Sequence, residues 1–125
     1  MLRTRSVVRG VVALAAIAVV ALAVPPLSLA LDESAMPPAS SLPALPEGAR
    51  VTGEDMGCAS GGCWRELTVD APPGMSDEQL KAEVLPDGYE CAFQGVLDLR
   101  RVCAGVIEAE SKSVQFFVQY ERWVH

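Results

Sequence analysis

Residues 114–123 read V-Q-F-F-V-Q-Y-E-R-W, which is the clearest strand pattern in the chain. Apolar residues recur there at every second position, so that they share one face of an extended backbone. That face holds Val114, Phe116, Val118 and Tyr120, with Gln115, Gln119 and Glu121 on the opposite face. The alternation is typical of a strand with one face on a core and the other toward solvent. The sequence therefore predicts a long half-buried strand over residues 114–123.

Three other segments also have strand character. Residues 63–69 alternate in the same way, and residues 90–93 and 102–107 are shorter runs rich in apolar side chains. Each is bounded by residues that favour turns, such as the Pro72-Pro73-Gly74 run. We expect three strands, or four if residues 90–93 also pair.

A helix is predicted between the first two of these strands. Ser76 suits the N-cap, and Gln79 falls three residues later, as a capping box requires. The first turn is acidic, which the helix dipole favours, and Pro86 follows a last turn that ends near Leu85. The order of elements predicts an α+β fold: a small disulfide-stabilised β-α-β-β sandwich, with one helix on a sheet of three or four strands.

The first thirty residues have the layout of an export signal or a single membrane anchor. Three arginines precede Gly10, and the 22 residues from Gly10 to Leu31 carry no charge. Small-x-small cleavage sites end at Ala23 and at Ala30, and if the segment is cut we expect the second to be used, which would leave Leu31 as the new N-terminus. The Pro25-Pro26 pair predicts that the helix ends there, short of a comfortable span. Both alternatives place the remaining chain outside the cytoplasm, because the arginines stay on the inner face.

The rest of the chain divides into two parts. Residues 31–50 contain four prolines and no helical or strand period, which predicts an extended Pro-rich tether. Residues 51–125 form the predicted extracytoplasmic domain and carry thirteen acidic against six basic residues, a net charge of −7. A surface this acidic repels phosphates, so we expect no nucleic-acid partner.

The four cysteines all lie in the predicted domain and indicate two disulfides. The spacing of Cys58 and Cys63 is C-x4-C before a strand, unlike a redox C-x-x-C at a helix N-terminus or a zinc knuckle. An exported setting favours oxidation. We expect the sequence-local pairs, Cys58–Cys63 and Cys91–Cys103. The rival pairing, Cys63–Cys103 with Cys58–Cys91, would follow if the first and third strands lay parallel and adjacent.

No catalytic, metal or cofactor site is predicted. The single histidine is His125, the last residue, which is a poor position for a general base. The carboxylates that could pair lie near strand ends, where acidic side chains are usually just solvated. We therefore expect a protein that is not an enzyme.

The candidate partner-binding residues are aromatic and basic. Trp64, Phe117 and Trp123 project from strand faces opposite the predicted core, where they would form a binding patch or be covered by residues 89–101. Arg100 and Arg101 form the one local basic spot.

From these features we expect a non-enzymatic, extracytoplasmic interaction module of the cell envelope, secreted or anchored by one N-terminal helix. Its partner would be a protein or another envelope component, and an uncleaved N-terminal segment would also contact the membrane. The alternative is a secreted inhibitor or effector, and a small enzyme is the third class.

Overall fold

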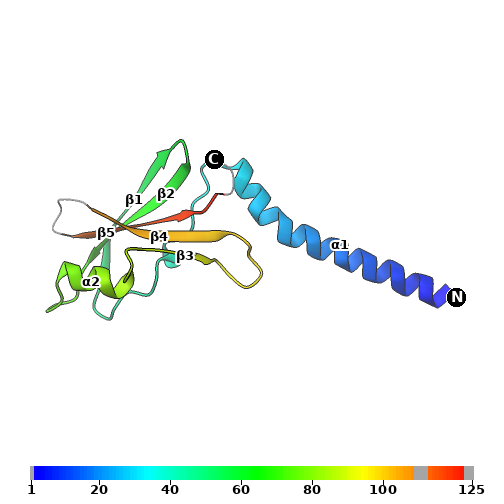
Figure 1. Cartoon of the computed structure of the whole chain (residues 1–125), viewed down its shortest axis with the longest axis horizontal. Helices are drawn as coiled ribbons and strands as arrows, with labels where there is room; N and C mark the ends of the chain where they lie inside the picture. The colour runs from blue at the N-terminus through cyan, green and yellow to red at the C-terminus, as the bar shows by residue number, and fades with distance from the viewer. Residues whose placement is uncertain (1, 109–112, 123–125) are drawn as a thin grey trace.

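Strand β5 (Val114–Tyr120) lies at the centre of the fold (Figure 1). The computed structural model describes residues 2–108 and 113–122. Within them, five strands form one antiparallel sheet in the order β1-β2-β5-β4-β3. The other four strands are β1 (Arg50–Ala59), β2 (Gly62–Asp70), β3 (Tyr89–Phe93) and β4 (Arg101–Ile107).

This sheet confirms the α+β class but corrects the predicted strand count of three or four. The additional strand is β1, which pairs with β2 in a long hairpin at one edge of the sheet. Its residues include Gly53, Glu54 and Asp55, and most of them are exposed. An exposed edge strand has no buried face, and therefore shows no alternation of apolar and polar residues. Strand β5 also ends at Tyr120, short of the predicted limit at Trp123, which lies outside the described residues.

The predicted helix is present as α2 (Asp77–Val84), and its capping box is confirmed. The Gln79 backbone N–H donates to the Ser76 hydroxyl at 3.2 Å, and the Ser76 N–H donates to the Gln79 side-chain oxygen at 2.9 Å. These bonds satisfy backbone donors that the first turn leaves free. Leu80 and Val84 point from α2 into the core.

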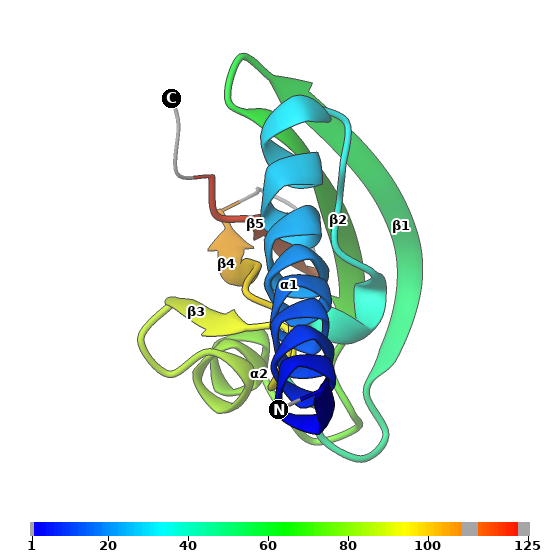
Figure 2. The same ribbon diagram turned by 90° about the vertical axis from the view of Figure 1, so that its right-hand side faces the viewer.

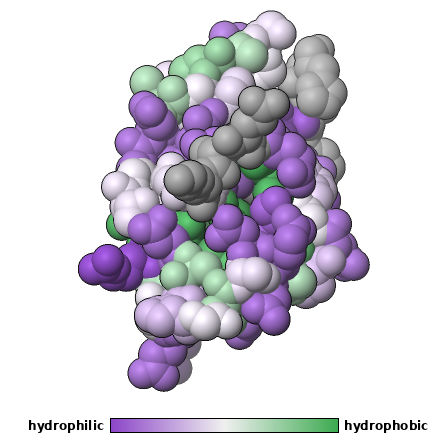
Figure 3. Space-filling view, turned by 90° about the vertical axis from the view of Figure 1, so that its left-hand side faces the viewer, coloured by the Kyte–Doolittle hydropathy of each residue, from purple (hydrophilic) through white to green (hydrophobic). Residues whose placement is uncertain are grey.

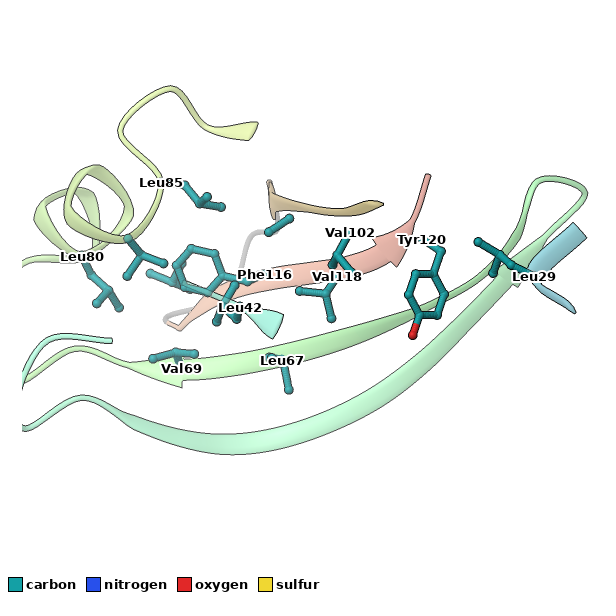
Figure 4. Close-up of a cluster of buried hydrophobic side chains, with 13 residues drawn as sticks. Leu29, Leu42, Leu67, Val69, Leu80, Leu85, Val102, Phe116, Val118 and Tyr120 are labelled. Carbon is teal, nitrogen blue, oxygen red and sulfur yellow. The ribbon is translucent and has the colours of Figure 1, made fainter. Parts of the chain in front are cut away.

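The core lies between the sheet and α2 (Figure 4). The alternation along β5 is confirmed, since Phe116 and Val118 are fully buried at its centre. The other core residues come from α1, the segment after it, β2, α2 and its C-terminal end, β4 and β5: Leu29, Leu42, Leu67, Val69, Leu80, Val84, Leu85, Val102, Ala104, Val114 and Tyr120.

The N-terminal helix α1 (Leu2–Leu31) projects away from the sheet and continues through Pro25 and Pro26, with a bend toward its C-terminal end (Figures 1 and 2). The prediction that the proline pair ends the helix was wrong. The final turn is supported by the domain, because Leu29 is buried in the core and Arg122 donates to its carbonyl. Tertiary contacts thus offset the loss of the two intrahelical hydrogen bonds that the prolines, which have no backbone N–H, cannot form. The helix is long and apolar enough to cross a membrane, a criterion that an export signal also meets.

The segment between α1 and β1 lies against the domain. It contains one short 3-10 helix, η1 (Ala39–Ser41), and is otherwise irregular. Pro37 and Leu42 are nevertheless buried, and the Arg65 Nε donates to the Pro37 carbonyl at 3.0 Å. The stretch that the sequence suggests is a tether therefore supplies part of the core.

Two disulfides join residues that are directly opposite across neighbouring strands. Cys58–Cys63 links β1 to β2, and Cys91–Cys103 links β3 to β4, with Cα–Cα distances of 4.1 and 4.0 Å. These are the sequence-local pairs. The rival pairing fails because β5 separates β2 from β4. Each bridge fastens an edge strand to its neighbour.

Removing the bridges separately should destabilise the domain unequally. We expect each double alanine variant, Cys58→Ala/Cys63→Ala and Cys91→Ala/Cys103→Ala, to lose about 2 to 3 kcal/mol of unfolding free energy. Because the sequence separations are 5 and 12, the second variant should lose about 0.8 kcal/mol more. Denaturant titration of the full chain in detergent, followed by tryptophan fluorescence, measures both losses. Equal losses, or a larger loss for the first variant, would contradict the loop-closure account.

Candidate functional site

The sheet face opposite α2, here called the open face, carries a row of aromatic side chains. Trp64 on β2 and Phe117 on β5 both lie on it, as the sequence predicts, and both are half-buried. Tyr89 on β3 joins them, with its ring centroid 6.3 Å from that of Phe117. The sequence did not single out Tyr89, because its place opposite Gly105 depends on the register of β3 against β4.

Two of these rings lie directly beside glycines of neighbouring strands, in the space that a side chain there would occupy. A Cβ atom added to Gly57 would come within 2.3 Å of the Trp64 ring, and one added to Gly105 within 2.4 Å of the Phe117 ring. The Trp64 indole N–H also donates to Glu66 at 2.8 Å. The rings are therefore held against the sheet in fixed positions, which lowers the entropy that binding a partner would cost.

A hollow of about 330 Å³ opens beside this row, next to the turn of the β1–β2 hairpin. Trp64, Tyr89, Gln119 and Arg122 line it, together with Gly61 and Gly62. The Arg122 guanidinium already donates to two backbone carbonyls, those of Leu29 and Asp32. The hollow thus offers ring surfaces and the Gln119 amide, which suit a contact with a polar or aromatic group on another molecule.

The two arginines of the predicted basic spot are placed differently. Arg101 lies on the open-face side of β4, opposite Phe93 and two residues before Cys103, whereas Arg100 precedes the strand. Arg100 donates to Asp98 from Nε and Nη2, at 2.9 and 2.6 Å, and its guanidinium lies 5.1 Å from the Tyr120 ring centroid. Arg101 forms an ion pair with Glu121 at 2.7 Å. Both arginines are thus neutralised by acidic neighbours. The third predicted aromatic residue, Trp123, lies outside the described residues.

Among the described residues, one group has three potential metal ligands within 4.8 Å of one another: Cys91, Cys103 and Glu121. The two sulfurs are bonded to each other. They are therefore not thiolates and cannot serve as ligands in this oxidised state.

The chain was compared with protein-family models, curated proteins and solved structures, and none of them matches it.

Adding a methyl group beneath either ring should displace it. We expect Gly57→Ala and Gly105→Ala each to lower the unfolding free energy by about 1 to 3 kcal/mol, because the sheet backbone cannot yield to the added carbon. Gly61→Ala is the matched control, since nothing lies within 4 Å of its added Cβ. Denaturant titration gives the energies, and the NMR shift of the Trp64 indole N–H reports the ring position. An unchanged shift in Gly57→Ala would show that the ring does not rest on this glycine.

The ion pair between Asp98 and Arg100 should make the unfolding free energy of the domain depend on pH. Hydrogen bonds from the Arg100 side chain lower the pKa of Asp98 below its ordinary value of 3.8. A carboxyl whose pKa is lower in the folded state contributes stability above its unfolded pKa and loses it as the pH falls through the folded value. The wild type should therefore lose more stability than Asp98→Asn between about pH 6 and about pH 2.5. Denaturation midpoints measured across this range test the difference, and parallel curves would contradict it.

Proposed function

We propose that the protein is a non-enzymatic extracytoplasmic interaction module, held on the outer side of a membrane by α1. Its open face would meet another protein or an envelope component. The observation that carries the anchored form is the junction between α1 and the domain. Leu29, in the last turn of α1, is only 4% exposed and belongs to the domain core.

Polar contacts support the same junction. Arg122, just after β5, donates to the Leu29 carbonyl at 2.6 Å and to the Asp32 carbonyl at 2.8 Å. The Cys63 N–H donates to the Glu33 carbonyl at 3.1 Å. The last turn of α1 is therefore bonded to the segment after β5, and Glu33, two residues beyond the helix, is bonded to β2, so that the helix and the domain are joined without a free spacer.

This junction argues against cleavage after Ala30. Such a cut would remove Leu29 and leave a cavity beside Tyr120, and emptying a buried leucine site usually costs about 2 to 5 kcal/mol. A retained α1 keeps the core intact. The uncharged part of α1 that lies before Leu29, residues 10–28, is about 28 Å long as a helix, close to the thickness of a bilayer's hydrocarbon core.

A secreted inhibitor or effector is the second candidate, and one observation favours it. Cleavage after Ala23 would leave the whole junction with the domain, so a released protein starting at Val24 would keep its core. The interaction role itself is supported by the fixed rings and the hollow of the open face, which present contact surface to another molecule.

Cell fractionation with intact-mass analysis separates the two candidates. The anchored module should remain in the membrane fraction after alkaline extraction, with the mass of a chain that includes α1. Protein in the medium that starts at Leu31 would contradict the anchored form and the role of Leu29 together. Protein in the medium that starts at Val24 would contradict the anchored module and support the second candidate, a secreted inhibitor or effector.

The partner is tested in the same cells. A photo-crosslinking benzoylphenylalanine at Gln119, in the hollow, should give a discrete adduct that Tyr89→Ala weakens. The matched control carries the probe at Glu83, which is exposed on α2. Adducts of equal yield at both positions would show that the open face is not the binding surface.

A further inference from the structure

The loop between β3 and β4 presents an apolar tip that nothing in the domain covers. Val96 is 99% exposed and Leu97 77%, and they are flanked by Phe93 at 59% and Leu99 at 45%. The loop is closed by hydrogen bonds from the Gln94 N–H to the Arg100 carbonyl at 3.0 Å and from the Asp98 N–H to the Gly95 carbonyl at 3.4 Å. Four neighbouring apolar side chains are thus held out toward solvent, which is unusual unless they contact another phase or molecule.

The tip is also electrically neutral. Asp98 is the one charged residue between Phe93 and Leu99, and the Arg100 side chain pairs with it at 2.6 Å. The domain as a whole is acidic and would be repelled by anionic headgroups. A neutral apolar tip lacks that penalty, and the cost of moving an unpaired charge toward hydrocarbon does not arise.

The position of the loop relative to α1 suggests what it touches. Figures 1 and 2 show the β3–β4 loop on the side of the domain from which α1 projects, extending in the same general direction as the helix. Figure 3 shows the opposite end of the molecule, where hydrophilic residues cover most of the surface. The domain therefore has an apolar projection toward α1 and a mainly polar end away from it.

The junction fixes this arrangement. Because Leu29 and Arg122 join α1 to the domain without a spacer, a membrane crossed by residues 10–28 would end close to where the domain begins. The surface beside the end of α1 would then lie at the level of the lipid headgroups. Apolar side chains at that level can enter the boundary between headgroups and acyl chains.

We propose that the tip of the β3–β4 loop, Val96 and Leu97 with Phe93 and Leu99, inserts into the bilayer surface beside α1. This inference rests on the anchored form of the proposed function. The helix and the loop would give the domain two points of contact with the membrane. Two contacts prevent the domain from tilting about α1 and so set the direction in which the open face points.

Photo-crosslinking in vesicles tests the contact. The full chain is made by cell-free synthesis with phosphatidylcholine vesicles under oxidising conditions, so that α1 is retained whatever cells do with it. A benzoylphenylalanine at Leu97 should crosslink to lipid several-fold more than the same probe at the control position Glu83, which lies on α2. Adding Val96→Asp to the Leu97-labelled chain should lower the lipid adduct several-fold, because it places an unpaired charge at the tip.

The outcomes are distinct. Lipid adducts at Leu97 that exceed those at Glu83 and fall in Val96→Asp support the inference. Equal lipid adducts at both positions, adducts to protein only, or no adduct at Leu97 in a chain that resists alkaline extraction would overturn it. Adducts to protein would instead assign the tip to a protein contact. Cleavage of α1 in cells would contradict the anchored function, whereas the vesicle result decides separately whether the tip meets lipid.

Discussion

The guanidinium of Arg122 joins the end of α1 to the segment that follows the central strand of the sheet. Arg122 comes two residues after the central strand β5. Its side-chain N–H groups donate to the carbonyl of Leu29, in the last turn of α1, and to that of Asp32, just beyond the helix. The last carbonyls of a helix have no partners within the helix and carry partial negative charge, so a cation there satisfies both needs. Gly62 makes room for it, because a Cβ atom at that position would lie 2.6 Å from the Arg122 Nε. The direction of α1 thus follows from the position of β5.

The centre of the sheet and its edges are stabilised in different ways. Strand β5 buries its apolar face on α2 and on the segment after α1, so that Leu42 does part of what a second helix would do in a larger fold. The edge strands bury little, and the disulfides hold them instead. A small domain has too little apolar surface to hold long edges by burial alone, which explains why both cross-links are found there.

Features that depend on neighbours in sequence were predictable, and those that depend on distant contacts were not. The alternation of β5, the Ser76 capping box and the sequence-local disulfides all follow from short-range spacing. Strand β1 was missed because an exposed edge has no apolar period, and Tyr89 because its neighbours depend on register. The helix through Pro25 was missed because its last turn depends on Arg122, nearly a hundred residues away. The placement of Trp64 and Phe117 on the open face was predictable, because side chains alternate between the two faces of a strand. Their contacts with Gly57 and Gly105 were not, because these depend on which strands are neighbours and in which register.

The packed segment after α1 changes what an anchored domain of this kind can do. A free tether would let the domain reach partners at many heights above a membrane, with an entropic cost on each capture. In the proposed anchored form, the bonds from Arg122 and Cys63 remove that freedom, and the neutral tip at Leu97 would remove rotation about α1 as well. The open face would then be presented at one height and in one direction. Such a module is suited to partners that lie close to the same membrane. A rigidly held domain pays little entropy to bind in the orientation in which it is already held, and it cannot turn to reach partners elsewhere.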